Sequence, residues 1–270
     1  MQIGQIYNKV AQTYNQDLSG EILHQSKMTA IDMVIKQRDQ LGAMLALGVG
    51  DGTDLLPYKK YYPKIAMHGL DISINMLKKT NLILDCQTYH GNITQASDLI
   101  DKKNFDLILA HFVTAYVPLP AILTECKKLL AKQGMISIIT NTMTSFPATQ
   151  AILPKLEHST NPFNKLVAHH VNKALKTVYV PKNLLHLQSI VEKNGFIVKD
   201  MKEEVIPIRL NSRKDIYDFF IKGGWFVSGL IHPLLPPMLL RRISNQLTRK
   251  YFQLHYEDTM KISMVTAELA

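Results

Sequence analysis

The stretch Leu45–Gly52 constrains the fold of this 270-residue chain more than any other feature. It reads Leu-Ala-Leu-Gly-Val-Gly-Asp-Gly, so an apolar run of strand type leads directly into three glycines at alternate positions. Because glycine has no Cβ, the backbone can turn sharply after the strand and expose its N–H groups to a ligand. The pattern predicts a strand–turn–helix unit that holds a ligand; the alternative is an ordinary turn between a strand and a helix.

A single acidic residue, Asp71, closes the next apolar run, about 20 residues after Gly52. That separation is typical of one βαβ unit, in which a carboxylate at the second strand end accepts hydrogen bonds from a ribose diol. The spacing of Gly48, Gly50 and Gly52 is GxGxG, whereas dinucleotide folds carry GxGxxG. The two features together favour an adenosine derivative other than a dinucleotide.

Apolar runs and helical patterns alternate along most of the chain, which predicts a parallel, doubly wound α/β sheet. An N-terminal part, Ile3–Gln37, has helical spacing. Helices are also expected over Phe146–Leu175, interrupted at Pro154 and Pro162, and over Asn183–Asn194. The expected strands are Met44–Leu47, Ala66–Leu70, Gln87–His90, Leu107–Ala110, Met135–Thr140, Phe196–Ile208 and Ile262–Glu268.

Composition excludes several classes of protein. With 46% hydrophobic residues the chain can bury one large core, and we expect a single domain over residues 1–270. The only cysteines, Cys86 and Cys126, are too few for a disulfide framework, and the adjacent His169 and His170 would diverge on a helix, so no metal is expected. No signal peptide or membrane-spanning run is evident, which favours a cytoplasmic location.

The order of the motifs resembles that of class I S-adenosylmethionine-dependent methyltransferases, in particular their type 11 (UbiE-like) group. The glycine turn is followed by Gly69-Leu70-Asp71-Ile72-Ser73, by Gly91-Asn92-Ile93, and by the strand Phe105–His111. The segment Glu125–Met135 is similar to the helix and turn before the fifth strand of that family. The resemblance implies a Rossmann-like, seven-stranded sheet with an antiparallel last strand, and S-adenosylmethionine as cofactor.

The same resemblance implies a set of cofactor-binding residues. These are Tyr14, Gly48, Val49, Gly50, Asp51, Gly52, Asp71, Ile72, Met76, Asn92, Ile93 and Ala110. Two positions depart from the family pattern: Ala46 replaces an acidic residue near the methionine end, and Asn92 replaces an Asp beside adenine. The Asn92 amide oxygen can still accept a hydrogen bond from the adenine amino group.

Methyl transfer from a sulfonium is a direct displacement and needs few catalytic side chains. A hydroxyl acceptor must lose a proton, and His111, just after the fourth strand, is the candidate base. A carboxylate acceptor needs no base. Tyr116, in the same loop, is the candidate for orienting the acceptor. Both residues can instead be ordinary packed side chains of the core.

The segment 209–258 is expected to form a helical lid between the last two strands, and residues 1–40 an N-terminal helical segment. Within 209–250 there are eight Lys or Arg and two Asp. The apolar run Trp225–Leu240 contains three prolines and is too short to span a bilayer. Such a lid can be a solvated cap, or it can cover an apolar substrate and attract a carboxylate, an acidic carrier protein or an anionic membrane surface. Nucleic acid is disfavoured because no base-reading module is present.

The N-terminal sequence Asn8–Asn15 and the following His24-Gln25-Ser26 are similar to the opening of the malonyl carrier-protein methyltransferases of biotin synthesis. We therefore predict a methyltransferase for a small or carrier-bound acceptor, most simply at oxygen. The alternatives are the malonyl carrier-protein enzyme, a lipid or quinone methyltransferase at a membrane surface, and a catalytically silent protein that binds S-adenosylmethionine.

Overall fold

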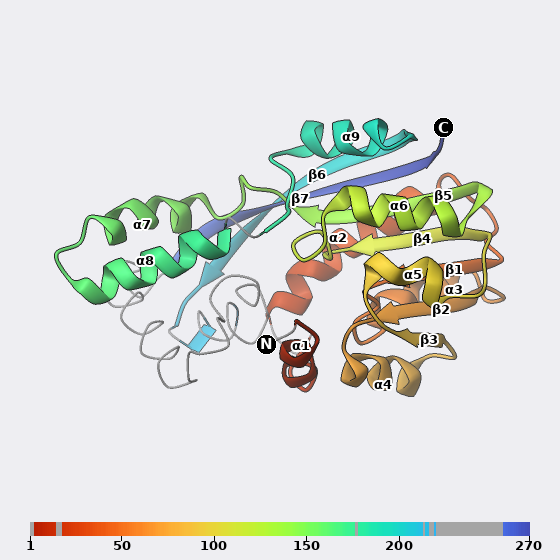
Figure 1. Cartoon of the computed structure of the whole chain (residues 1–270), viewed down its shortest axis with the longest axis horizontal. Helices are drawn as coiled ribbons and strands as arrows, with labels where there is room; N and C mark the ends of the chain where they lie inside the picture. Colours follow the sequence, from red (N-terminus) through yellow and green to blue (C-terminus); the bar gives the residue numbers. More distant parts are fainter. Residues whose placement is uncertain (1–2, 15–17, 176–177, 213, 216–218, 220–255) are drawn as a thin grey trace.

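A computed structural model describes residues 3–14, 18–175, 178–212, 214–215, 219 and 256–270. Its centre is a seven-stranded sheet with the order β3-β2-β1-β4-β5-β7-β6 (Figure 1). The strands are β1 (Ala43–Leu47), β2 (Ala66–Asp71), β3 (Gln87–His90), β4 (Phe105–His111), β5 (Leu130–Asn141), β6 (Phe196–Leu210) and β7 (Tyr256–Leu269). Strand β7 lies between β5 and β6 and is antiparallel to both, whereas β1 to β5 pair in parallel. The predicted fold class, including the antiparallel last strand, is confirmed.

The described residues also form nine α-helices and two short 3-10 helices, which precede the first strand or connect the strands. They are α1 (Ile3–Val10), α2 (Leu18–Ile35), η1 (Thr53–Leu55), α3 (Leu56–Tyr61), α4 (Ile74–Ile83), η2 (Ile93–Gln95), α5 (Ala96–Leu99), α6 (Leu119–Leu129), α7 (Pro147–Glu157), α8 (Pro162–Leu175) and α9 (Leu184–Lys193). Local sequence explains several starts: the Ser73 side chain caps α4 and the Asn183 side chain caps α9, each accepting a hydrogen bond from a first-turn N–H.

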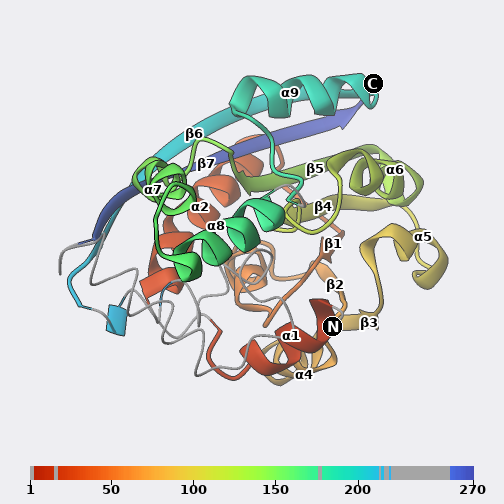
Figure 2. The ribbon, with the colours of Figure 1, turned by 60° about the vertical axis from the view of Figure 1, so that its left-hand side comes forward.

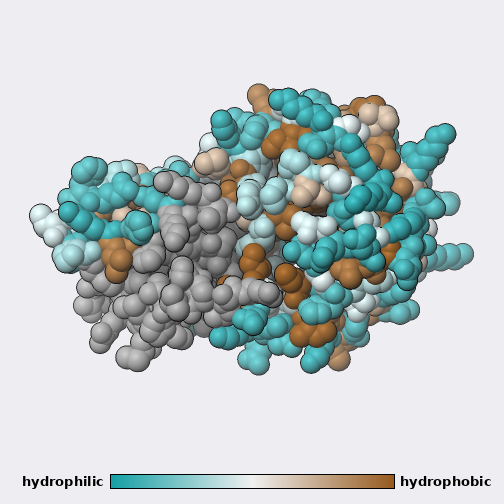
Figure 3. All heavy atoms as spheres, in the orientation of Figure 1, coloured by the Kyte–Doolittle hydropathy of each residue, from teal (hydrophilic) through white to brown (hydrophobic). Residues whose placement is uncertain are grey.

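Two apolar clusters cover the two faces of the sheet. On one face Leu45 and Ile108 pack with α6 and α9, and on the other face Met44 and Leu107 pack with α2 and α3. This alternation follows from the strand period of two, and it makes β1 buried at every residue. Figure 2 shows the helices on both sides of the sheet, and Figure 3 shows mainly hydrophilic residues on the outer surface of α6.

Two sequence expectations need correction. Helix α7 is not interrupted at Pro154 but continues to Glu157. The proline removes only one N–H donor, and the buried Ile152 and Leu156 keep this helix packed against the rest of the chain. The predicted lid 209–258 is too long, since β6 extends to Leu210 and β7 begins at Tyr256. In the predicted N-terminal helical segment the described residues form α1 and α2.

The strands β6 and β7 are longer than predicted because their far halves pair with each other beyond β5 and pack on α2 through a third apolar cluster. Residues 220–255 lie outside the described residues, so the helical lid stays a prediction. The described helices contain none that is long and apolar enough to cross a membrane.

Candidate functional site

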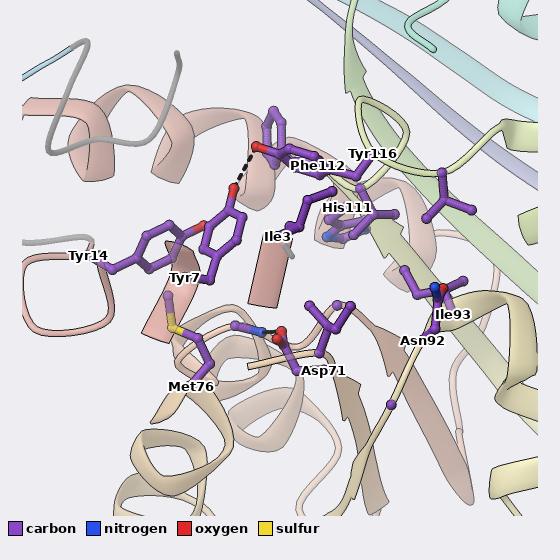
Figure 4. A pocket seen from close by; sticks show the side chains of 16 residues that line it. Ile3, Tyr7, Tyr14, Asp71, Met76, Asn92, Ile93, His111, Phe112 and Tyr116 are labelled. Carbon is purple, nitrogen blue, oxygen red and sulfur yellow. Dashed lines mark hydrogen bonds between the residues drawn. The ribbon is translucent and has the colours of Figure 1, made fainter. Parts of the chain in front are cut away.

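The carboxyl ends of β1, β2 and β4 meet at one edge of the sheet, as parallel strands require, and a pocket opens there (Figure 4). Its walls come from α1, the glycine turn, the ends of β2 and β3, and the loop after β4. The lining residues are Ile3, Tyr7, Tyr14, Gly48, Gly50, Asp71, Ile72, Met76, Gly91, Asn92, Ile93, His111, Phe112, Val113, Tyr116 and Val117. Residues more than 100 positions apart thus form one site.

The glycine turn has a backbone that other residues would strain. Gly48 has φ +77°, and a Cβ there would lie 2.4 Å from Cγ1 of Val113. Gly50 has φ +61°, and the nearest atom to a Cβ there would be Cε1 of Tyr14, at 3.8 Å. Both residues occupy the left-handed region, which glycine adopts without a steric cost. Close packing on the loop after β4 explains why the first of these glycines has no room for a side chain.

Asp71 holds the turn and the end of β2 together. Its Oδ2 accepts a hydrogen bond from the N–H of Gly50 at 2.9 Å, and its Oδ1 accepts one from the N–H of Ser73 at 2.8 Å. Burial raises the pKa of this carboxyl, and the backbone hydrogen bonds oppose that rise. Since a carboxylate has about four acceptor positions, capacity remains for a ligand diol.

Asn92 and Ile93 lie at the end of β3. The Oδ1 of Asn92 accepts a hydrogen bond from the N–H of Thr94 at 3.1 Å and so caps η2, while the residue remains exposed. Ile93 is 8% exposed and forms an apolar wall of the pocket together with Val113. This end of the pocket therefore offers an apolar surface with one amide, which suits a purine ring.

Helix α1 closes the other side of the pocket. Gly4 lies so close to β2 that a Cβ would be 2.6 Å from the carbonyl oxygen of Ile72. The Oδ1 of Asn8 accepts hydrogen bonds from Ser73 Oγ at 2.7 Å and from the N–H of Asn75 at 3.1 Å. The Nδ2 of Asn75 donates to the backbone oxygen of Asn8 at 3.0 Å. These contacts attach α1 to the same turn that contains Asp71.

Three tyrosines form an aromatic group at the site. The hydroxyl oxygens of Tyr7 and Tyr116 are 2.6 Å apart, and their rings are perpendicular with centroids 5.7 Å apart. The ring of Tyr14 meets that of Tyr7 edge to face, at 6.3 Å between centroids. Burial is the main cause that raises the pKa of all three hydroxyls, so they remain neutral hydrogen-bonding groups.

His111 ends β4 and faces the pocket, with its Nε2 3.0 Å from Ser137 Oγ. Its Nδ1 is buried and has no hydrogen-bond partner among the described residues. Burial, and secondarily the charge of Lys27, lowers the pKa of the imidazole to about 3. Lys27 itself forms an ion pair with Asp54 at 2.5 Å. The imidazole is therefore neutral near pH 7.

Four predicted cofactor residues do not line the pocket. Val49 packs against Gly69, and Ala110 lies in the apolar cluster under α6. Asp51 accepts hydrogen bonds from the backbone N–H and the hydroxyl of Thr53, and Gly52, with φ +82°, turns the chain into η1. Their predicted binding roles stay predictions, because backbone atoms of this turn can serve a ligand without side chains. Ala46 packs in the cluster beneath α2, away from the lining residues.

The sequence reasoning missed six lining residues, which are Ile3, Tyr7, Gly91, Phe112, Val113 and Val117. Tyr7 had a signal, because it shares the N-terminal segment with Tyr14. No sequence signal pointed to Phe112, because its φ of +56° is a conformation that a bulky residue seldom adopts. Among the described residues no group of three or more His, Cys, Asp or Glu is placed to hold a metal ion.

Comparison with known proteins agrees with this geometry. Residues 45–136 match a family described as a methyltransferase domain. No curated protein matches the chain in sequence. Among solved structures, the YcgJ protein of Bacillus subtilis is 14% identical with a TM-score of 0.55, over 90% of this chain and 99% of that protein.

Two further structures extend the comparison. The S-adenosylmethionine-dependent methyltransferase of Thiobacillus denitrificans, solved with S-adenosylhomocysteine, is 12% identical with a TM-score of 0.53, over 91% of each chain. The geranyl diphosphate C-methyltransferase of Streptomyces coelicolor, also solved with S-adenosylhomocysteine, is 11% identical with a TM-score of 0.50, over 92% of this chain and 81% of that one. At these identities the likeness concerns the fold alone.

Proposed function

We propose that this chain is a class I methyltransferase that binds S-adenosylmethionine in the pocket at the carboxyl ends of β1, β2 and β4 and transfers its methyl group to an oxygen of a small or carrier-bound acid. The match of residues 45–136 to a methyltransferase domain and the fold shared with solved methyltransferases support this proposal. When bound, S-adenosylmethionine supplies a methyl group activated by a sulfonium. The protein's own part is to hold the reactants in line and to exclude water.

The residues of the pocket fit this cofactor. Asp71 would hold the ribose diol, because its carboxylate is fixed by Gly50 and Ser73 and retains acceptor capacity. The bare turn at Gly48 and Gly50 would lie against the amino-acid part of the cofactor, where a side chain would intrude. The apolar wall with Ile93, beside the exposed amide of Asn92, would receive adenine.

The observation that supports an acid as the acceptor is the state of His111. An effective general base has a pKa near the working pH, whereas burial lowers the pKa of His111 to about 3. A hydroxyl acceptor would need a stronger base than this imidazole, but a carboxylate is already a nucleophile. His111 then lines the pocket as a neutral group.

The test follows methyl groups from labelled S-adenosylmethionine into a panel of carboxylic acids, free and thioester-linked, and into matched alcohols. Methyl esters release methanol in mild base, whereas ethers and methylated amines do not. Base-labile label would support the proposal. Base-stable label would instead indicate a hydroxyl or nitrogen acceptor. Cofactor binding with no transfer to any acceptor would favour the silent binding protein.

The variant His111→Gln separates the two oxygen chemistries. If the acceptor is a carboxylate, turnover should stay within about tenfold of the parent protein, because only a hydrogen bond is lost. If His111 removes a proton from a hydroxyl, kcat should fall by 10² to 10⁴, roughly the contribution of general-base catalysis. S-adenosylhomocysteine affinity, measured on the same samples, shows whether the cofactor site is intact.

A further inference from the structure

The hydroxyl pair of Tyr7 and Tyr116 lies across the pocket and joins two elements that are 109 residues apart in sequence. Tyr7 comes from α1 and Tyr116 from the loop after β4, and Figure 4 shows their hydroxyls pointing at each other. Both rings line the pocket, next to Phe112 and His111. The pair therefore borders the side of the pocket opposite the adenine wall.

A count of hydrogens shows what this pair can offer a ligand. Two hydroxyls carry two O–H donors, and the bond between them uses one. The second O–H has no protein partner among the hydrogen bonds of the described residues, so it can be donated to a ligand. A hydroxyl that already accepts a hydrogen bond is also a better donor, because linked bonds polarise one another.

Either hydroxyl can be the donor of this bond. In both cases one O–H of the pair remains for the ligand: that of Tyr116 if Tyr7 donates, and that of Tyr7 if Tyr116 donates.

The position of Tyr7 depends on how α1 is attached. Gly4 lies in close contact with Ile72, and Asn8 bonds to Ser73 and Asn75, so the residues on either side of Tyr7 are fixed to the turn of Asp71. Tyr7 has little freedom to leave Tyr116 while α1 remains in place. The attachment thus holds Tyr7 next to Tyr116.

We propose that Tyr7 and Tyr116 together position the methyl acceptor: one hydroxyl donates to the other, and the remaining O–H of the pair is directed toward a carboxylate oxygen of the acceptor. This inference rests on the proposed function, because it assumes that an acid binds beside the methyl group. The class of ligand follows from the donors on this side of the pocket, since the tyrosine pair offers an O–H, whereas Asp71 serves the ribose in the proposed function. Carboxylate oxygens accept hydrogen bonds from such donors more strongly than neutral oxygens do.

The experiment measures binding of an acid to the protein saturated with S-adenosylhomocysteine. Sodium octanoate and sodium malonate are titrated at pH 7.5, and their Kd is followed by saturation-transfer NMR. The variants are Tyr7→Phe, Tyr116→Phe and the double variant, with Tyr179→Phe as the control because Tyr179 is half exposed and outside the pocket. Calorimetry gives the affinity of each variant for S-adenosylhomocysteine, and thermal melting shows that each is folded.

We expect each single variant to weaken binding of the better probe by about tenfold, the range for one hydrogen bond to a charged group. The double variant should lose little more than either single one, because the two hydroxyls act as a unit. Affinity for S-adenosylhomocysteine should change less than twofold in all of them, and Tyr179→Phe should resemble the parent protein.

Three results would overturn the inference. Loss of acid binding in only one of the two single variants would show that this tyrosine acts without the other. Independent, additive losses in the double variant would contradict the shared hydrogen bond. If the parent protein binds S-adenosylhomocysteine but neither acid, the carboxylate assignment is wrong. Failure to bind S-adenosylhomocysteine at all would instead refute the proposed function.

Discussion

The two ends of the pocket are built in different ways. At the proposed cofactor end, formed by the glycine turn, Asp71 and the end of β3, most contacts join residues close in sequence, and backbone N–H groups supply them. At the proposed acceptor end, formed by Tyr7, His111 and Tyr116, side chains from distant segments meet one another. The first end depends on backbone conformation, and the second depends on tertiary packing.

This difference explains what the sequence could predict. A glycine spacing and an acidic strand end are local patterns, and they led to Gly48, Gly50 and Asp71, all of which line the pocket. The contact between Tyr7 and Tyr116 spans 109 residues, and no local pattern encodes it. The low pKa of His111 likewise arises from burial, which only the folded chain determines.

The sheet shows the same limit. The bounds of β1 and β2 were predicted to within one residue, because buried strands have continuous apolar runs. Those of β3, a polar strand that is only partly buried, were predicted without error. Strands β6 and β7 were predicted too short. Their outer halves alternate polar and apolar residues, and their length depends on pairing with each other.

The largest effect should come from breaking the cofactor end at Gly48. Gly48→Ala combines a left-handed backbone with a Cβ 2.4 Å from Val113, so we expect a loss of about 3 kcal/mol in the free energy of unfolding, measured in urea. Gly50→Ala is the matched control, because its φ is similar but its Cβ has space; it should lose about 1 kcal/mol. Equal losses would mean that the contact with Val113 is unimportant.

The next effect concerns Asp71. Asp71→Ala should weaken S-adenosylmethionine binding by about 1.5 to 3 kcal/mol through loss of hydrogen bonds to the ribose. Asp106→Ala is the control, since Asp106 also accepts two backbone N–H bonds, from Gly42 and Ala43, but lies outside the pocket. Calorimetry on both variants should show a change in cofactor affinity only for Asp71→Ala. Unchanged affinity in a folded Asp71→Ala protein would refute this position for the cofactor.

The acceptor end should make the protein sensitive to acid. The pKa of His111 is about 3 in the folded chain and about 6.5 in the unfolded chain. Between these two values the imidazole is protonated in the unfolded state and neutral in the folded state. Stability then falls as the pH decreases from 6.5 toward 3. When the pH is lowered from 7.5 to 5, protonation of His111 in the unfolded state should reduce the free energy of unfolding by about 2 kcal/mol. Urea unfolding of His111→Gln should show a pH dependence smaller by that amount; an unchanged dependence would mean that the imidazole is accessible to protons.

The smallest effect concerns the attachment of α1, which links the two ends. Asn8→Ala removes the acceptor of two hydrogen bonds, and we expect it to reduce S-adenosylhomocysteine affinity by about 1 kcal/mol, less than Asp71→Ala does. Gln12→Ala, an exposed neighbour after α1, is the control and should have no effect. A loss as large as that of Asp71→Ala would indicate that Asn8 contacts the cofactor directly.

The central claim is that the cofactor end binds S-adenosylmethionine although Ala46 replaces the acidic residue usual in class I methyltransferases. Calorimetric titration of the purified protein with S-adenosylmethionine, S-adenosylhomocysteine and NADH tests it most directly. We predict micromolar binding of the two sulfur nucleotides and no binding of NADH. Binding of NADH, or of none of the three, would contradict the account.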